Sequence, residues 1–351
     1  MELNQTVEKL WKHAVENKTK ESYDVSYTHF ERFMLLNNVH LHAGYIPPIL
    51  EEIPIYFVAY CFRHLSLQYS TIKLYLCGIH YKYLQSNVQS PFEKPDQSNL
   101  NKLDQSNLKK PNQSNLKKLA LILKYVKRLQ GAMPRIRLPI TFDILEKICY
   151  RLRKGFINNF VDCLIETSCT IALFDFLRCG KFTVRNTSDF DVTVNLYISD
   201  VLFYDDYAVL KLKESKTDPF RQSICIQLHK INHSICLFLV LQKYIASRIE
   251  RIIYFSSCDP LFITEFCQPL DINYFIGKLK HVSQLVGCDS SLYNGHSVRS
   301  GGATSASQAL FEDNMIKTLG RWSSQSYCTY IKASKNTIKQ AQQSLTNSKC
   351  R

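Results

Sequence analysis

Apolar side chains recur at intervals of three or four positions through the first part of the chain, which is the spacing of one helical face. One such stretch predicts a helix capped by Thr19, and another predicts a helix capped by Ser70. An apolar segment over residues 53–62 separates them. Residues 1–93 therefore predict a small all-helical domain, although the pattern alone does not distinguish a DNA-binding module from a protein-interaction module.

The second half of the chain combines helical periods with strand periods. A helix capped by Thr141 is expected over residues 142–152, and a long buried helix is expected over 161–177. Alternation with a period of two then predicts three strands, over residues 192–198, 208–212 and 224–228. Helical spacing returns over residues 234–249, 272–286, 299–310, 313–319, 324–331 and 337–345. Residues 138–351 thus predict an α+β domain, mainly helical with a small antiparallel sheet.

Residues 94–137 differ from both flanking regions and predict a basic linker. The sequence Gln-Ser-Asn-Leu occurs there three times with a period of eight, which is typical of a polar loop. The segment holds eleven Lys or Arg residues and two Asp residues, a net charge of +9 out of the chain's +14. Its lysines either contact DNA phosphates or only keep the linker solvated. The candidate DNA-binding residues are Lys109, Lys110, Lys117, Lys118, Lys124, Lys127 and Arg128.

Composition narrows the class of protein. The 351 residues are enough for two domains, and the excess of positive charge favours polyanionic partners. Thirteen cysteines without a paired C-x-x-C pattern predict reduced thiols, with Cys61, Cys77, Cys149, Cys163 and Cys169 in the core. The longest strongly apolar run, over residues 235–241, is too short to cross a bilayer. We expect a soluble protein without a membrane partner, located in the nucleus of a eukaryotic host or otherwise in the cytoplasm.

One short region near the end of the chain concentrates groups suited to phosphoryl transfer. His296 and Arg299 are three residues apart, so they lie on one helical face. Trp322 follows, and Tyr330 comes eight residues after it. Arginine binds two phosphate oxygens at once, and a tyrosine hydroxyl can attack phosphorus when its phenolate is stabilised. Together these residues indicate a phosphoryl-transfer site that needs no metal.

In these motifs the sequence resembles the tyrosine recombinases, the phage integrases and their relatives. The runs Gly-His-Ser-x-Arg, Leu-Gly-Arg-Trp-Ser-Ser and Tyr-Ile are most similar to recombinases of DIRS-type and Crypton-like mobile elements. The resemblance extends over residues 19–345. It implies a SAM-like core-binding domain and a catalytic domain that act on double-stranded DNA as a dimer or tetramer. It also implies DNA recombination or integration through a 3′-phosphotyrosine, without a cofactor or metal.

The resemblance assigns a role to each candidate residue. Arg178 and Arg299 would clamp the phosphate, and His296 would accept a proton or bind a phosphate oxygen. Lys216, in a predicted hairpin, would donate a proton to the leaving oxygen, with Lys213 as its rival. Trp322 would pack the site or bind a phosphate oxygen through its N–H group. Tyr330 would be the nucleophile, with Tyr327 one helical turn earlier as its rival.

Position 181 departs from the family pattern. Relatives usually carry an acidic residue three positions after the first catalytic arginine, and this chain has Lys181. A cation there would leave Arg178 without its supporting carboxylate. A catalytically inactive DNA-binding protein derived from such a recombinase is therefore an alternative function. A type IB topoisomerase is another, because it uses the same chemistry.

Overall fold

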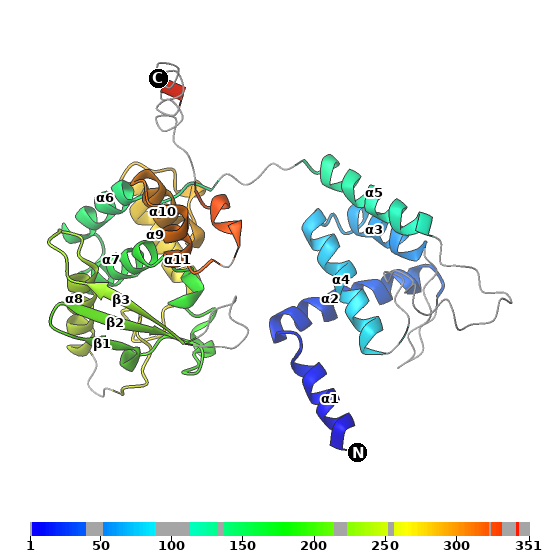
Figure 1. The fold of residues 1–351 in the computed structure, drawn as a ribbon, viewed down its shortest axis with the longest axis horizontal. Coiled ribbons are helices and arrows are strands. Elements are labelled where there is room, and N and C mark those ends of the chain that lie inside the picture. Colours follow the sequence, from blue (N-terminus) through cyan, green and yellow to red (C-terminus); the bar gives the residue numbers. More distant parts are fainter. Residues whose placement is uncertain are drawn as a thin grey trace. The chain divides into compact units, whose positions relative to one another are not determined.

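The computed structural model divides the chain into two separately packed units, residues 1–134 and 135–351 (Figure 1). The structure describes residues 2–39, 52–86, 88, 113–131, 137–213, 223–251, 256–322, 324–331 and 342–343. No helix in these described ranges is long and apolar enough to cross a membrane.

The first unit is all-helical over its described residues. Its helices are α1 (Glu2–His13), α2 (Asn17–Leu36), α3 (Ile53–Arg63), α4 (Tyr69–Gln85) and α5 (Gln113–Leu129). Its core is aromatic: the Phe30 and Phe57 rings meet edge to face, with centroids 5.2 Å apart. The predicted caps Thr19 and Ser70 are wrong, because the N-caps are Glu16 and Gln68 and both residues lie inside the first helical turn.

Helix α5 belongs to the first unit, although its sequence lies in the predicted linker. Leu119 and Val126 are buried in the same core as α2, α3 and α4. The Gln130 side chain donates to the carbonyl of Leu67 at 2.7 Å and accepts from the N–H of Tyr69 at 2.6 Å. Residues 113–129 of the predicted linker are therefore a helix that packs in the first unit. Residues 94–112, which include two of the three repeats, lie outside the described residues.

The second unit is mainly helical with one small antiparallel sheet, as predicted. Its helices are α6 (Phe142–Arg153), α7 (Asn159–Phe174), α8 (Leu237–Ile249), α9 (Ile272–Leu285), α10 (Gly295–Gln308) and α11 (Asp313–Gly320). Its strands are β1 (Val201–Phe203), β2 (Tyr207–Leu212) and β3 (Ile224–His229). They pair in the order β1–β2–β3, with Leu202 opposite Val209 and Leu210 opposite Ile226.

Several predicted elements of this unit differ in the structure, and α10 begins at Gly295 rather than at the predicted residue 299. Residues 192–198 are not a strand, because the side chains of Asp191 and Asn195 bond the local backbone and form a turn. The helix predicted over 161–177 ends at Phe174, and residues 324–331 form only the 3-10 turn η6 (Gln325–Thr329). The helix predicted over 337–345 lies outside the described residues except for residues 342–343.

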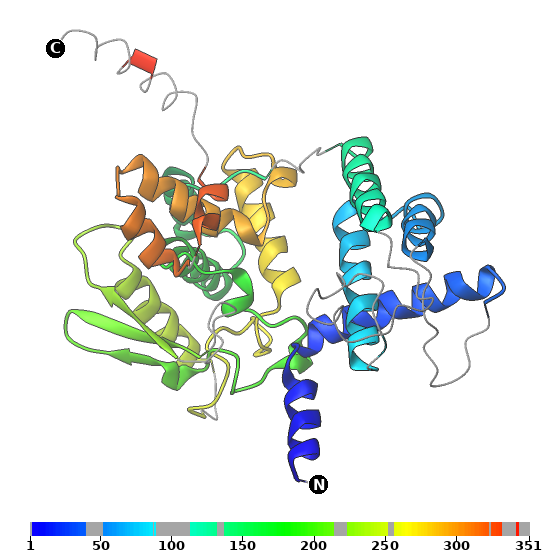
Figure 2. The same cartoon turned by 45° about the vertical axis from the view of Figure 1, so that its right-hand side comes forward.

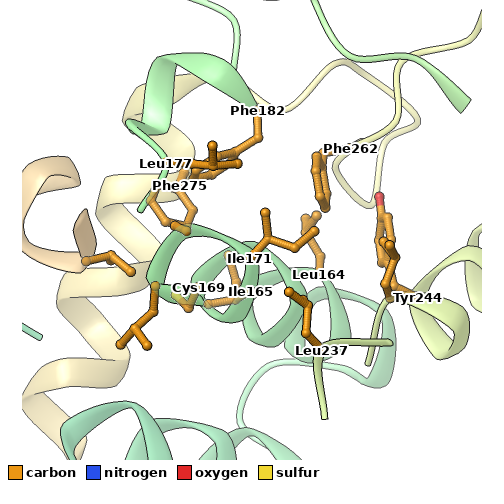
Figure 3. Close-up of a cluster of buried hydrophobic side chains, with 14 of the residues drawn as sticks. Leu164, Ile165, Cys169, Ile171, Leu177, Phe182, Leu237, Tyr244, Phe262 and Phe275 are labelled. Atoms are coloured by element: carbon orange, nitrogen blue, oxygen red, sulfur yellow. The ribbon is translucent and has the colours of Figure 1, made fainter. Parts of the chain in front are cut away.

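Helix α7 is the centre of the second unit. Nearly all of its side chains are buried, and it packs against α6, α8, α9 and α10. Figure 3 shows Leu164, Ile165 and Ile171 of α7 together with Leu237 of α8 and Phe275 of α9. Two buried carboxylates are also paired, since Glu166 accepts from Arg153 Nε at 2.7 Å and Asp162 accepts from backbone N–H groups. The central helix therefore fixes the turn that follows it, which carries Arg178.

The twelve cysteines in the described part of the chain are free thiols. Four of the five that were expected in the core are buried: Cys61, Cys149, Cys163 and Cys169. Cys77 is exposed, because its position on α4 faces away from the aromatic core. Burial raises the pKa of the Cys149 thiol to about 12, so this thiol is protonated at neutral pH.

The approach of α10 to the segment before α6 depends on Gly301. A Cβ atom on Gly301 would lie 1.6 Å from the carbonyl oxygen of Ile140, a backbone atom that cannot move aside alone. We predict that Gly301→Ala lowers the free energy of unfolding by at least about 2 kcal/mol. Gly277→Ala is the matched control, since Gly277 in α9 has no atom within 4 Å of such a Cβ. It should be neutral or stabilising by up to about 1 kcal/mol. Chemical denaturation of both variants tests this contrast, and equal values would contradict it.

Candidate active site

Helix α10 begins with a capping box that orients its first turns. The Asn294 side chain accepts from the N–H of His296 at 2.9 Å, and the Ser297 hydroxyl accepts from the N–H of Asn294 at 3.0 Å. Figures 1 and 2 show α10, which packs against α7 and α11. His296 consequently lies in the first turn of α10, and Arg299 lies one turn further on.

Arg299 is buried, with 3% of its surface exposed, and it joins three segments. Its Nη1 donates to the carbonyl of Phe176, and its Nη2 donates to the carbonyl of Gly320 at 2.9 Å. The guanidinium carbon lies 4.4 Å from the centre of the Trp322 ring and 5.6 Å from the centre of the Tyr330 ring. Burial, and secondarily the charge of Arg178, lower the pKa of Arg299 to about 10. It therefore remains a cation at neutral pH.

Arg178 lies in the turn after α7 and caps the 3-10 turn η2 (Cys179–Lys181). The backbone reverses at Phe176, which has a positive φ of 47°. A small pocket of about 20 Å³ lies beside this turn. Four cationic residues line it, namely Arg178, Lys181, Arg299 and Arg321. Such a lining is suited to the oxygens of a phosphate.

Arg321 and its partner Asp175 were not singled out from the sequence. Arg321 ends α11 in the left-handed conformation, with φ 53° and ψ 46°, and its Nη2 donates to the backbone carbonyl of Asp175. Gly320 before it leaves room for the Trp322 ring, because a Cβ there would lie 1.7 Å from a ring carbon. The run Leu-Gly-Arg-Trp contained the only available signal, but its spacing does not reveal that Arg321 meets a residue from α7.

His296 is exposed at the start of α10. The protein around the ring still removes part of its hydration, which lowers its pKa, and the charges of Arg178 and Arg299 lower it further. Because the ordinary value already lies below 7, His296 is neutral at physiological pH. A neutral imidazole can accept a proton, so the arrangement suits a general base.

Trp322 lies between the two candidate tyrosines. Its ring centre is 5.5 Å from that of Tyr330 and 6.1 Å from that of Tyr327. Its Nε1 is buried, with no hydrogen-bond partner among the described residues. The indole N–H is therefore a donor that a phosphate oxygen could satisfy if one reached it.

Tyr330 and Tyr327 differ in burial. Tyr330 is half-buried, and its backbone carbonyl accepts from Ser300 at 2.7 Å and from Thr304 at 3.1 Å. Tyr327 is 2% exposed, and burial together with a hydrogen bond to Asp313 raises its pKa. The ring of Tyr330 faces Arg299, whereas Tyr327 packs in the small core around Trp322. Of the two tyrosines, Tyr330 is the one that is partly open to solvent and faces the Arg299 guanidinium.

The structure describes only one of the two candidate lysines, Lys213. Lys216 belongs to residues 214–222, which lie outside the described part of the chain. Lys213, at the end of β2, bonds the carbonyl of Asn195 at 3.1 Å and pairs with the Asp200 carboxylate at 3.1 Å. Its Nζ also lies over the Tyr197 ring. Lys213 is thus held by the loop before β1.

The candidate DNA-binding cations that the structure describes lie on α5. Five of them are exposed there: Lys117, Lys118, Lys124, Lys127 and Arg128. The Lys127 ammonium lies 5.6 Å from the centre of the Tyr69 ring. Lys109 and Lys110 lie outside the described residues. The basic character predicted for this region is therefore carried, in its described part, by the solvent face of a packed helix.

The arrangement of helices and sheet is that of the tyrosine recombinase fold. The structure of the XerH site-specific recombinase in a post-cleavage complex with palindromic difH matches with a TM-score of 0.58 and 14% identity. That match covers 92% of this chain and 78% of XerH. The Tn1549 transposon integrase with transposon right-end DNA matches with a TM-score of 0.50, 12% identity and coverage of 97% and 98%. A lambda integrase dimer on a COC′ core site matches with a TM-score of 0.50, 13% identity and 94% coverage of each chain.

Sequence comparison adds no closer assignment. No family model matches the sequence, and no curated protein matches it. At identities of 12–14%, the structural likeness establishes the fold alone. The family resemblance of the motifs is therefore supported at the level of the fold, and the DIRS-type or Crypton-like subtype stays a prediction.

The two carbonyl bonds of Arg299 predict a specific loss of stability when it is shortened. We expect Arg299→Lys to lower the free energy of unfolding by about 2 kcal/mol, because one ammonium cannot reach both carbonyls. Arg178→Lys is the matched control, and we expect it to change the same quantity by no more than about 0.5 kcal/mol. Denaturant titration of both variants without DNA measures the difference. A similar loss in both variants would show that Arg299 does not join the segments.

Proposed function

We propose that this protein cleaves and rejoins DNA strands through a covalent 3′-phosphotyrosine, as a tyrosine recombinase. The observation that carries the proposal is the convergence of Arg299, Trp322 and Tyr330 at one place in a recombinase fold. Arg178 lines the adjoining cationic pocket, and His296 interacts electrostatically with both arginines. Isolated tyrosines and arginines are common, but this combination on this fold is specific.

The proposed reaction uses each of these groups once. The Tyr330 oxygen forms a bond to phosphorus, the bond to the 5′ oxygen breaks, and neutral His296 takes the tyrosine proton. Lys216 donates a proton to the departing 5′ oxygen. Arg178 and Arg299 bind the non-bridging oxygens, where negative charge grows in the transition state. A 5′ hydroxyl then attacks the phosphotyrosine and restores the backbone, so the energy of the broken bond is conserved.

The proposed partners are double-stranded DNA and further copies of this chain. Solved structures with this fold include a lambda integrase dimer on a core site and a lambda integrase tetramer on a Holliday junction. The basic face of α5 and the pI of about 9.1 suit a DNA partner. We further propose that the protein comes from a mobile element, on the strength of its motifs, and acts in the nucleus if its host is a eukaryote.

A second candidate function is DNA binding without cleavage. The observation that favours it is Lys181, which lines the pocket among three arginines where relatives usually carry an acid. Crowded cations repel, and the repulsion could misplace Arg178. Under this alternative, the wild-type protein binds DNA but forms no covalent adduct with a suicide substrate.

The nucleophile can be tested with paired tyrosine variants. We predict that Tyr330→Phe abolishes the covalent protein–DNA adduct on a nicked suicide substrate and leaves DNA affinity within about threefold. Tyr327→Phe should retain the adduct, because its ring is in the core and only a buried hydroxyl is lost. Denaturing gel electrophoresis detects the adduct. Its persistence in Tyr330→Phe together with its loss in Tyr327→Phe would reverse the assignment.

The basic region can be tested through the salt dependence of binding. Affinity falls with salt by a slope of roughly 0.9 per phosphate contacted, because counterions are released. Replacing Lys109, Lys110, Lys117 and Lys118 by Gln should lower that slope by up to about 3–4 and leave sequence preference unchanged. The measurement is the dissociation constant at several salt concentrations for both proteins. An unchanged slope would mean that these lysines are only solvated.

A further inference from the structure

The cationic pocket contains more positive charge than the family pattern would place there. Arg178, Lys181, Arg299 and Arg321 line it together. Burial lowers the pKa of both Arg299 and Arg321, and the charge of Arg178 lowers both pKa values further. In the resembling family an acid at the position of Lys181 would offset this charge. This chain has a lysine at that position, so a charge that offsets the cations of the pocket would come from another residue.

Asp175 carries a carboxyl group and lies in the turn after α7, three residues before Arg178. It caps the C-terminal end of α7, is 8% exposed, and its Oδ2 has no hydrogen-bond partner among the described residues. Arg321 donates to the backbone carbonyl of Asp175, so its guanidinium lies next to the residue that carries this carboxyl group. Burial raises the pKa of Asp175 to about 7, and the charge of Arg321 opposes that rise. Burial lowers the pKa of Arg321, and the charge of Asp175 opposes that shift in turn.

The turn that contains Asp175 also receives the other arginines. Arg321 bonds the carbonyl of Asp175, Arg299 bonds the carbonyl of Phe176, and Arg178 follows two residues later. Two carbonyl dipoles of this turn therefore accept hydrogen bonds from the cluster, and the same turn carries the Asp175 carboxyl group. The negative charge comes from three residues before Arg178, whereas relatives usually carry it three residues after that position.

We propose that Asp175 supplies, from the end of α7, the counter-charge that position 181 lacks, and that it acts through Arg321 as a positioning residue for the phosphate-binding arginines. This inference rests on the proposed function. A buried carboxylate oxygen without a hydrogen bond costs stability, because burial penalises the charged form of the group. Replacing it by the isosteric amide therefore separates its effect on the arginines from its effect on the fold.

The test uses Asp175→Asn alone and combined with Lys181→Glu. We expect Asp175→Asn to keep or increase the free energy of unfolding while slowing single-turnover adduct formation about tenfold or more. Lys181→Glu should accelerate adduct formation more in the Asp175→Asn background than in the wild-type background, because it restores a carboxylate on the other side of Arg178. DNA affinity measured in parallel separates weakened binding from slower cleavage.

Two results would overturn the proposal. One is adduct formation by Asp175→Asn at the wild-type rate, and the other is an equal acceleration by Lys181→Glu in the two backgrounds. If wild-type protein forms no adduct at all, the proposed function fails, and a second measurement still tests the pair. A double-mutant cycle of Asp175→Asn and Arg321→Met on the free energy of unfolding should give a favourable coupling between the wild-type residues. A coupling of zero would refute the interaction independently of catalysis.

Discussion

The proposed active site depends on one buried guanidinium. The Arg299 guanidinium donates hydrogen bonds to backbone carbonyls of two segments that are far apart in the sequence, one after α7 and one at the end of α11. Its planar face also covers the Trp322 ring. Because the group is planar and carries five donors, it can bind two carbonyls and still present N–H groups to a ligand. The same side chain therefore joins two segments of the fold and serves the proposed chemistry, so a substitution of Arg299 affects both.

This arrangement requires a close backbone approach of α10. A Cβ on Gly302 would lie 2.3 Å from the carbonyl oxygen of Leu173 in α7, and Gly301 is equally restricted by Ile140. Both glycines lie within one turn of Arg299. Their small size brings the α10 backbone near enough to the end of α7 for the guanidinium to reach Phe176. Glycine lowers the intrinsic helix propensity at these positions, but it allows the close approach through which Arg299 contacts Phe176.

Crowding of positive charge is the second constraint on this region. A pocket that binds a phosphate strongly must hold its cations close together, and burial increases their repulsion when the phosphate is absent. Here two backbone carbonyls in the turn after α7 accept hydrogen bonds from Arg299 and Arg321, and the carboxylate of Asp175 is the counter-charge that we propose in place of a residue at position 181. Local electrostatics of this kind depends on which segments meet. It can therefore be rebuilt from a different part of the chain while the fold stays the same.

The sequence by itself determined the fold class and most of the helices, because those depend on local periodicity: α6, α9 and α11 begin within one residue of their predicted starts. It also indicated the motifs around Arg299, Trp322 and Tyr330, whose spacing along the chain reflects the helix and turn that carry them. Only the tertiary structure decided that α5 packs in the first core, that residues 192–198 form a turn, and that Asp175 lies against Arg321. The physical reason is the range of the interactions. Helical periodicity is set by neighbouring residues. Burial of α5, and the hydrogen bond from Arg321 to the backbone carbonyl of Asp175 146 residues away, depend on contacts that no local pattern encodes.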